Sequence, residues 1–270
     1  MIMGVLTIML NCVLFSVLCL ICLIPGSLLE SKPPSVKILV IGRTGSGKST
    51  LINNILGRKI ASVGDRPYPE TTTVSLYKQE IYGVSVTACD TPGLRDASGK
   101  DEKYMKKIKA SCDDPDLVIF CQSMDNTRWQ TDDEIALKTV TEHLGSKIWE
   151  HSVLVLTFAD RFIANLQNEV DKLEAFKQRQ LDLKRLFKGA LEEIKVPHKQ
   201  LYNATSARGP IKLPGMGNWM TNLMITCLAA THENGKEGFR QIIVGRVADP
   251  HQEDEEPLTW TDTLCNLMQK

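Results

Sequence analysis

A glycine-rich segment that contains a single lysine is the clearest chemical signal in the sequence. It reads GRTGSGKST over residues 42–50, between an apolar run at 36–41 and a helical stretch. Glycines let the backbone wrap phosphate groups so that N–H groups point inward, and the helix offers its positive N-terminal end to the same anion. Lys48 is expected to reach the β- and γ-phosphates, and the Ser49 hydroxyl to bind Mg²⁺. The predicted phosphate-binding residues are Arg43, Thr44, Gly45, Ser46, Gly47, Lys48, Ser49 and Thr50.

A second motif, DTPG at residues 90–93, ends the strand-like run 84–89. An aspartate at the C-terminal end of a strand beside a phosphate loop is placed to hold Mg²⁺ through water. We therefore predict that Asp90 helps to hold the metal and that the Gly93 N–H contacts the γ-phosphate. These residue types also favour an ordinary turn. The distance of the motif behind the phosphate loop favours the metal and phosphate roles.

A run of threonines lies between these two motifs, in the sequence ETTTV at residues 70–74. Nucleotide switches need one threonine that contacts Mg²⁺ and the γ-phosphate and is released after hydrolysis. Two strand-like runs that alternate like a hairpin follow at 77–81 and 84–89. Counting back from them, Thr71 is the favoured residue for metal binding and catalysis, and Thr72 is the second. The alternative is a β-prone threonine run that only opens a strand.

The choice of base is predicted from the segment TFAD at residues 157–160, which follows the apolar run 153–156. A carboxylate at Asp160 can accept two hydrogen bonds from guanine N1–H and the 2-amino group, whereas adenine offers no such pair. Phe158 stands where guanine-binding motifs usually have lysine, and an aspartate that caps the next helix is the alternative. The stretch TSA at 205–207 resembles a loop that contacts guanine O6, which assigns Ser206. These features favour guanine over adenine nucleotides.

Strand-like and helical stretches alternate along most of the chain. Alternation of this kind predicts an α/β fold with a mostly parallel sheet and helices on both faces, and ligands at the C-terminal ends of the strands. The predicted strands are 36–41, 74–81, 84–89, 117–121, 153–157 and 200–204. The predicted helices are about 49–56, 99–110, 131–144, 164–194 and 218–230.

Charge and cysteine usage narrow the class of protein further. The 270 residues carry a formal net charge of zero, and no block of five or more Lys/Arg occurs. A nucleic-acid partner is therefore not expected, because such proteins need a basic face. Eight cysteines occur, and no paired Cys/His spacing indicates zinc, since the one CxxC, Cys19 and Cys22, lies within the apolar N-terminal run. Isolated cysteines at core-like positions fit a reducing compartment.

The first 24 residues are almost entirely apolar, and no charge precedes Glu30. A bilayer core of about 30 Å needs about 20 apolar residues as a helix, so this segment predicts an N-terminal transmembrane anchor. A cleaved signal peptide is the alternative, but it usually has a basic start and a shorter core. The nearest basic residues, Lys32 and Lys37, follow the segment and place the rest of the chain in the cytosol.

These motifs together resemble those of the AIG-type G domains. That group holds the GTPases of immunity-associated proteins (GIMAP) and, more distantly, the Toc-type chloroplast import GTPases. The resemblance rests on GRTGSGKSTLINNILG at 42–57, DTPGLRDASG at 90–99 and LVLTFAD at 154–160, and on the stretch 116–145, which looks like a box of that family. It implies a Rossmann-like P-loop NTPase fold, GTP/GDP and Mg²⁺ as ligands, and a nucleotide-dependent homodimer or oligomer. The predicted organisation is an anchor at 1–24, a linker at 25–35, an AIG-type G domain at 36–232 and a C-terminal tail at 233–270.

Hydrolysis is expected to be slow in an isolated molecule. Leu94 stands where Ras-like proteins place the glutamine that positions the attacking water, and leucine cannot orient water. An arginine from a second subunit could compensate: Arg128 is the candidate and Arg95 the second, although Arg128 in an ordinary surface ion pair is the alternative. A scaffold that GTP locks on the membrane, with negligible turnover, is the competing hypothesis.

Overall fold

The computed structural model describes residues 33–61, 75–91, 100–125, 129, 131–166, 171–196, 201–208 and 211–248. All of these except Pro33 belong to one compact unit, Pro34–Lys270. Within this part of the chain, no helix is both long and apolar enough to cross a bilayer. The anchor predicted at 1–24 lies outside the described residues. So do six residues considered above for nucleotide binding or hydrolysis: Thr71, Thr72, Gly93, Leu94, Arg95 and Arg128.

A single sheet forms the centre of the described unit, with the strand order β2-β3-β1-β4-β5-β6. β1 pairs in parallel with β3 and β4, and β5 pairs in parallel with β4 and β6, whereas β2 is antiparallel to β3. This confirms the mostly parallel α/β fold, and each predicted strand is found to within two residues. The strands are β1 (Ser35–Gly42), β2 (Ser75–Ile81), β3 (Val84–Asp90), β4 (Leu117–Ser123), β5 (Ser152–Thr157) and β6 (Tyr202–Thr205).

The three central strands are apolar along nearly their whole length because both of their faces are covered. All six residues of β5 are buried, as are all but Ser123 of β4. A parallel strand between two helical layers reads as a continuous apolar run, since neither face meets water. β2, at the edge, is mostly exposed and correspondingly polar.

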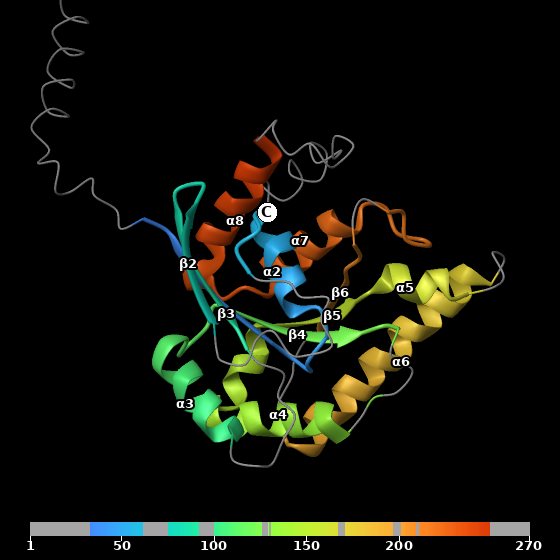
Figure 1. The fold of residues 1–270 in the computed structure, drawn as a ribbon, viewed down its shortest axis with the longest axis horizontal. Coiled ribbons are helices and arrows are strands. Elements are labelled where there is room, and N and C mark those ends of the chain that lie inside the picture. Colours follow the sequence, from blue (N-terminus) through green and yellow to red (C-terminus); the bar gives the residue numbers. More distant parts are fainter. Residues whose placement is uncertain are drawn as a thin grey trace, which may run out of the picture. The chain divides into compact units, whose positions relative to one another are not determined.

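Helices cover both faces of the sheet, as Figure 1 shows: α2, α7 and α8 lie on one side, and α3, α4 and α6 lie on the other. The layer of α4 and α6 is tied to the sheet by aromatic rings, for example Phe187 of α6, whose ring centroid lies 5.1 Å from that of Phe120 in β4. The helices are α2 (Lys48–Leu56), α3 (Lys100–Ser111), α4 (Thr131–Leu144), α5 (Ala159–Ala164), α6 (Lys172–Glu193), α7 (Trp219–Ala230) and α8 (Glu233–Ala248), with the 3₁₀ helix η2 (Ser146–His151).

Two helical segments differ from the sequence prediction. The helix expected at 164–194 begins later, because α6 starts at Lys172, and the short helix α5 (Ala159–Ala164) before it was not expected. The first 16 residues of the expected C-terminal tail form α8, whose residues Phe239, Ile242 and Ile243 are buried. The C-terminal end of α8 is joined to α2, because Arg246 donates to the carbonyl oxygens of Asn54 and Ile55. The buried apolar residues of α8 are few and lie among charged ones, so hydrophobic periodicity gave only a weak signal for this helix.

The cysteines also differ in part from the expectation of isolated thiols. Cys89, at the end of β3, and Cys112, just after α3, form a disulfide with a Cα–Cα distance of 6.6 Å. The expectation is wrong for this pair, because α3 brings two cysteines together that lie 23 residues apart in sequence. Cys121 and Cys227 are free and buried, as expected. Burial raises the pKa of the Cys121 thiol to about 12, so this thiol stays protonated at neutral pH.

Candidate nucleotide site

The phosphate loop begins at Gly42, the last residue of β1, and only glycine fits there. Gly42 has a φ of 147° and pairs with Cys121 of β4. A Cβ atom at this position would lie 2.5 Å from the Cys121 carbonyl oxygen. Gly45 and Gly47 also have positive φ, of 76° and 81°, and Gly47 directly precedes α2. The glycine pattern therefore produces a tight turn whose backbone leads into the N-terminus of a helix, as anion binding requires.

Lys48 lies at the first position of α2 with only 7% of its surface exposed. Its Nζ donates to the carbonyl oxygens of Gly42, at 3.1 Å, and of Arg43, at 2.8 Å. Burial lowers the pKa of the Lys48 ammonium from its ordinary value, and the negative charge of Asp90 opposes that change. The ammonium is thus folded back onto its own loop, where it is held over the turn that would surround a phosphate.

Ser49 and Asp90 meet between the phosphate loop and the end of β3. The Ser49 hydroxyl donates to Asp90 Oδ2 at 2.5 Å, and the aspartate is fully buried. Burial raises the pKa of the Asp90 carboxyl, while the Ser49 hydrogen bond and the Lys48 charge lower it.

Asp90 Oδ1 is buried and has no hydrogen-bond partner among the described residues. A hydroxyl beside a buried carboxylate with a free oxygen is a donor set that suits Mg²⁺, which prefers hard oxygen ligands and keeps several waters. The residues present therefore fit the metal that the sequence predicts: Ser49 would bind it directly and Asp90 through water.

The end of β5 is joined to the phosphate loop by Thr157. Its hydroxyl donates to the carbonyl oxygen of Ser46 at 2.8 Å and lies 3.3 Å from the carbonyl oxygen of Gln122. Phe158 follows in the left-handed region, with a φ of 56°. Its ring packs against the loop so closely that a Cβ on Gly47 would lie 3.3 Å from it. The phenylalanine that replaces the usual lysine therefore forms an aromatic wall beside the phosphate loop.

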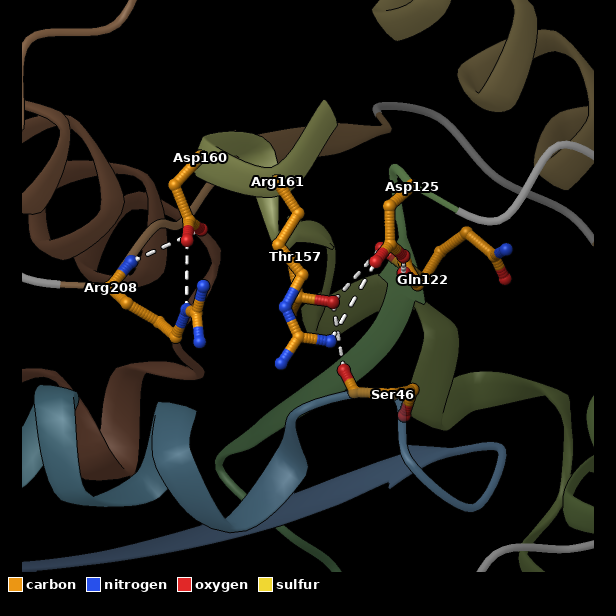
Figure 2. Close-up of polar contacts among 8 residues, drawn as sticks. Ser46, Gln122, Asp125, Thr157, Asp160, Arg161 and Arg208 are labelled. Carbon is orange, nitrogen blue, oxygen red and sulfur yellow. Dashed lines mark hydrogen bonds and ion pairs between the residues drawn. The ribbon is translucent and has the colours of Figure 1, made fainter. Parts of the chain in front are cut away.

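Asp160 and Ser206 come from different loops, and the structure brings these loops together. Ala159 donates through its backbone N–H to the Ser206 carbonyl oxygen at 3.2 Å, and the Ser206 N–H donates to the Leu156 carbonyl oxygen at 2.8 Å. Both oxygens of Asp160 accept hydrogen bonds from Arg208: Oδ2 from Nε at 2.8 Å, and Oδ1 from the backbone N–H at 3.3 Å. Figure 2 shows Arg208 reaching Asp160 and, separately, Thr157 bonded to Ser46 of the phosphate loop.

Phe158 lines two cavities. The smaller, of about 10 Å³, is lined by residues that include Gly47, Thr50, Ser206 and Arg208, on the side predicted to hold the base. The larger, of about 350 Å³, is lined by residues that include Arg43, Ser46, Gln122, Asp125 and Arg161.

Arg161 adds a positive charge beside the Phe158 ring, in the lining of the larger cavity. Its guanidinium lies 4.3 Å from the centre of the Phe158 ring and 3.8 Å from Asp125 Oδ2. No sequence motif predicted a role for Arg161, Asp125 or Arg208. The available signal was proximity in sequence, since Arg161 follows Asp160 and Arg208 lies two residues after Ser206.

The strand order and the position of these loops define the class of protein. A mostly parallel sheet with one antiparallel edge strand carries a phosphate loop after β1, an aspartate at the end of β3, and the loops that follow β5 and β6. All of them lie at one edge of the sheet, where nucleotide sites of such folds occur. The chain is therefore a P-loop G domain in its fold.

Comparison with known proteins gives the family. Residues 36–189, more than half of the chain, match the AIG1 family, and the chain belongs to that family. It is 28% identical over 214 residues to Translocase of chloroplast 159 of Arabidopsis thaliana, which covers 72% of this chain and 14% of that protein. It is 27% identical over 169 residues to GTP-binding protein A of Dictyostelium discoideum, covering 58% of this chain and 37% of that protein. The chain thus spans well under two thirds of these relatives.

Solved structures agree on the fold. A dimerization-deficient mutant of Toc33 from Arabidopsis thaliana superposes with a TM-score of 0.58 at 21% identity, covering 76% of this chain and 87% of that one. Toc33 in complex with GDP and Mg²⁺ gives a TM-score of 0.56 at 23% identity, with the same coverage. At these identities the likeness confirms the α/β G-domain architecture of the described unit.

Proposed function

We propose that this chain is a membrane-anchored protein that binds GTP and GDP with Mg²⁺, hydrolyses GTP slowly, and self-associates in a nucleotide-dependent way. The observation that carries the proposal is the meeting of three groups at one edge of the sheet. These are the Lys48 ammonium, the Ser49–Asp90 pair and the Asp160 carboxylate. The Lys48 ammonium suits the phosphates of the nucleotide, and the Ser49–Asp90 pair suits its Mg²⁺. The Asp160 carboxylate suits the edge of guanine.

Guanine nucleotides suit this site better than adenine nucleotides because of Asp160. The carboxylate lies one loop away from the phosphate loop, and Thr157 ties its strand to that loop. Two adjacent acceptor oxygens match the two N–H groups on the edge of guanine, and a site built on such hydrogen bonds discriminates strongly. Two findings on other proteins support the choice: Toc33 is solved with GDP and Mg²⁺, and a curated relative is named GTP-binding protein A.

Turnover in this proposal depends on a second copy of the chain. Leu94 cannot position water, so groups from a partner are needed for an appreciable rate. For the related translocon components atToc33 and psToc159, dimerization is described as important for GTPase activity. We propose Arg128 for the trans role, on the basis of its place between β4 and α4. In the alternative, GTP drives assembly and turnover is negligible.

The hydrolysis rate per molecule should therefore rise with protein concentration. The experiment is single-turnover hydrolysis by the full chain in mild detergent, with GTP and with ATP, over a wide range of protein concentrations. We expect hydrolysis of GTP and not of ATP. Arg128→Ala should flatten the rise, with a loss on the order of 10³-fold at saturation if Arg128 acts as a trans arginine does in related GTPases.

The matched control for this test is Arg240→Ala, which removes an arginine that is paired with Glu237 on the surface of α8. It should leave both the rate and its concentration dependence unchanged. A GTPase rate per molecule that does not vary with concentration would exclude the trans mechanism. No turnover at any concentration, with GTP bound, would favour the scaffold.

The anchor is proposed from the apolar segment 1–24 and the basic residues that follow it. We expect the segment to remain attached and the G domain to face the cytosol. External protease applied to intact cells should then leave the G domain uncut, and it should be cut once the cells are permeabilised. A mature N-terminus near residue 27, or a G domain recovered from the medium, would show that the segment is a signal peptide.

A further inference from the structure

The guanine-reading carboxylate is already engaged by a positive side chain of the same chain. Arg208 donates from Nε to Asp160 Oδ2 at 2.8 Å and from its backbone N–H to Oδ1 at 3.3 Å. The Asp160 side chain is 13% exposed and that of Arg208 is 55% exposed. A carboxylate with little exposed surface is thus paired with the guanidinium of a more exposed side chain.

The two contacts have different consequences for a ligand. The backbone N–H keeps the carboxylate oriented and is independent of the arginine side chain. The guanidinium, in contrast, holds Oδ2, one of the two oxygens that guanine N1–H and the 2-amino group would need. Guanine and the Arg208 guanidinium therefore compete for the same acceptor.

The cavity beside this contact is small as well. The cavity lined by Gly47, Thr50, Phe158, Ser206 and Arg208 measures about 10 Å³, roughly the volume needed for one water molecule. A purine ring is too large for the enclosed part of this cavity, so a shift of its lining would give the base more room. Arg208 is the side chain best able to move, because it is long and half-exposed, and Asp160 is its only ionic partner among the described residues.

We propose that Arg208 is a latch on the base site: its guanidinium closes over Asp160 and must swing away before guanine binds. This inference rests on the proposed binding of guanine nucleotides by Asp160. The closed latch reduces the fraction of molecules that can accept the base, so the apparent affinity is lowered by that fraction. An ion pair with this exposure opens readily, so the latch slows nucleotide entry without preventing it.

The test is the association rate of a fluorescent GDP analogue with Mg²⁺ and the full chain in mild detergent, measured by stopped flow. Arg208→Ala removes the guanidinium and keeps the backbone N–H that orients Asp160. The association rate constant should rise roughly three- to tenfold, with the dissociation rate constant nearly unchanged, because the latch is absent from the bound state. Arg208→Lys should fall between the two, since a lysine keeps the charge and loses the planar fork.

Salt gives a second readout that separates the latch from general attraction of the phosphates. Salt weakens the latch only in the wild type, and Arg208→Lys, which keeps the positive charge beside the site, shows how far the loss of charge alone changes the attraction of the nucleotide. The ratio of the Arg208→Ala rate to the wild-type rate should therefore shrink as salt is raised. Arg185→Ala, which removes an arginine with 74% of its side chain exposed on α6, is the matched control and should give a ratio near one.

Each outcome decides the proposal. Equal association rates for wild type and Arg208→Ala at every salt concentration would overturn the latch. Faster dissociation or slower association in Arg208→Ala would overturn it too, and would make Arg208 a contact of the bound nucleotide. If the folded wild-type chain binds no guanine nucleotide at all, the proposed function fails, and the latch fails with it.

Discussion

Replacing Lys48 with alanine should weaken the binding of GTP and GDP by about 100-fold or more. The Lys48 ammonium is the charged side chain that the phosphate loop holds almost completely out of water, at 2.8 Å from the Arg43 carbonyl oxygen. Loss of one partner from a buried charged contact costs about 2–5 kcal/mol, and each 1.4 kcal/mol is a factor of ten in affinity. Isothermal titration of the purified full chain with GTP and Mg²⁺ measures the effect.

Two controls make this result interpretable. Lys59→Ala removes an exposed lysine just beyond α2 and should bind GTP like the wild type. Circular dichroism should show that Lys48→Ala keeps its secondary structure, because the substitution removes a charge whose burial is itself costly. GTP affinity like that of the wild type in a folded Lys48→Ala variant would exclude the assignment of the phosphate site.

Replacing Asp160 with asparagine should shift the preference from guanine to xanthine nucleotides. In the wild type, ATP should compete with GTP only weakly, because adenine cannot pair with both carboxylate oxygens. An asparagine amide can donate to the 2-oxo group that replaces the amine in xanthine, whereas it leaves the guanine amine without an acceptor. Buried hydrogen-bonding sites discriminate by large factors, so we expect the ratio of GTP affinity to XTP affinity to fall by about 100-fold or more.

The readout of this second prediction is the ratio of the two affinities, measured by competition against a fluorescent GDP analogue. A ratio is required because Asp160→Asn also weakens the contact with Arg208, which changes the affinity for every base. Asp182→Asn is the control: it makes the same change of side chain in a residue of α6 that is paired with Arg185 on the surface. An unchanged ratio in Asp160→Asn would show that this carboxylate does not read the base.

The positions of the phosphate loop and of the central strands were predictable from the sequence because the signals are local. The loop is one contiguous segment, and its glycines at 42, 45 and 47 are the residues that need the backbone conformations observed. β4 and β5 are apolar runs because both of their faces are covered, and α4 has the predicted bounds, Thr131–Leu144. The helices α5 and α8 were not predicted. α5 has only six residues, and α8 has few apolar residues among charged ones.

Only the tertiary structure decided how distant residues meet at the site. The Arg208–Asp160 contact joins residues 48 apart in sequence, and it depends on β5 and β6 lying side by side. The disulfide between Cys89 and Cys112 likewise depends on how α3 returns to β3. By itself, the sequence determined which groups could bind phosphate, metal and base, because residue type and local spacing carry that chemistry. Which of these groups already hold one another is set by strand order and loop conformation, which are not local properties of the chain.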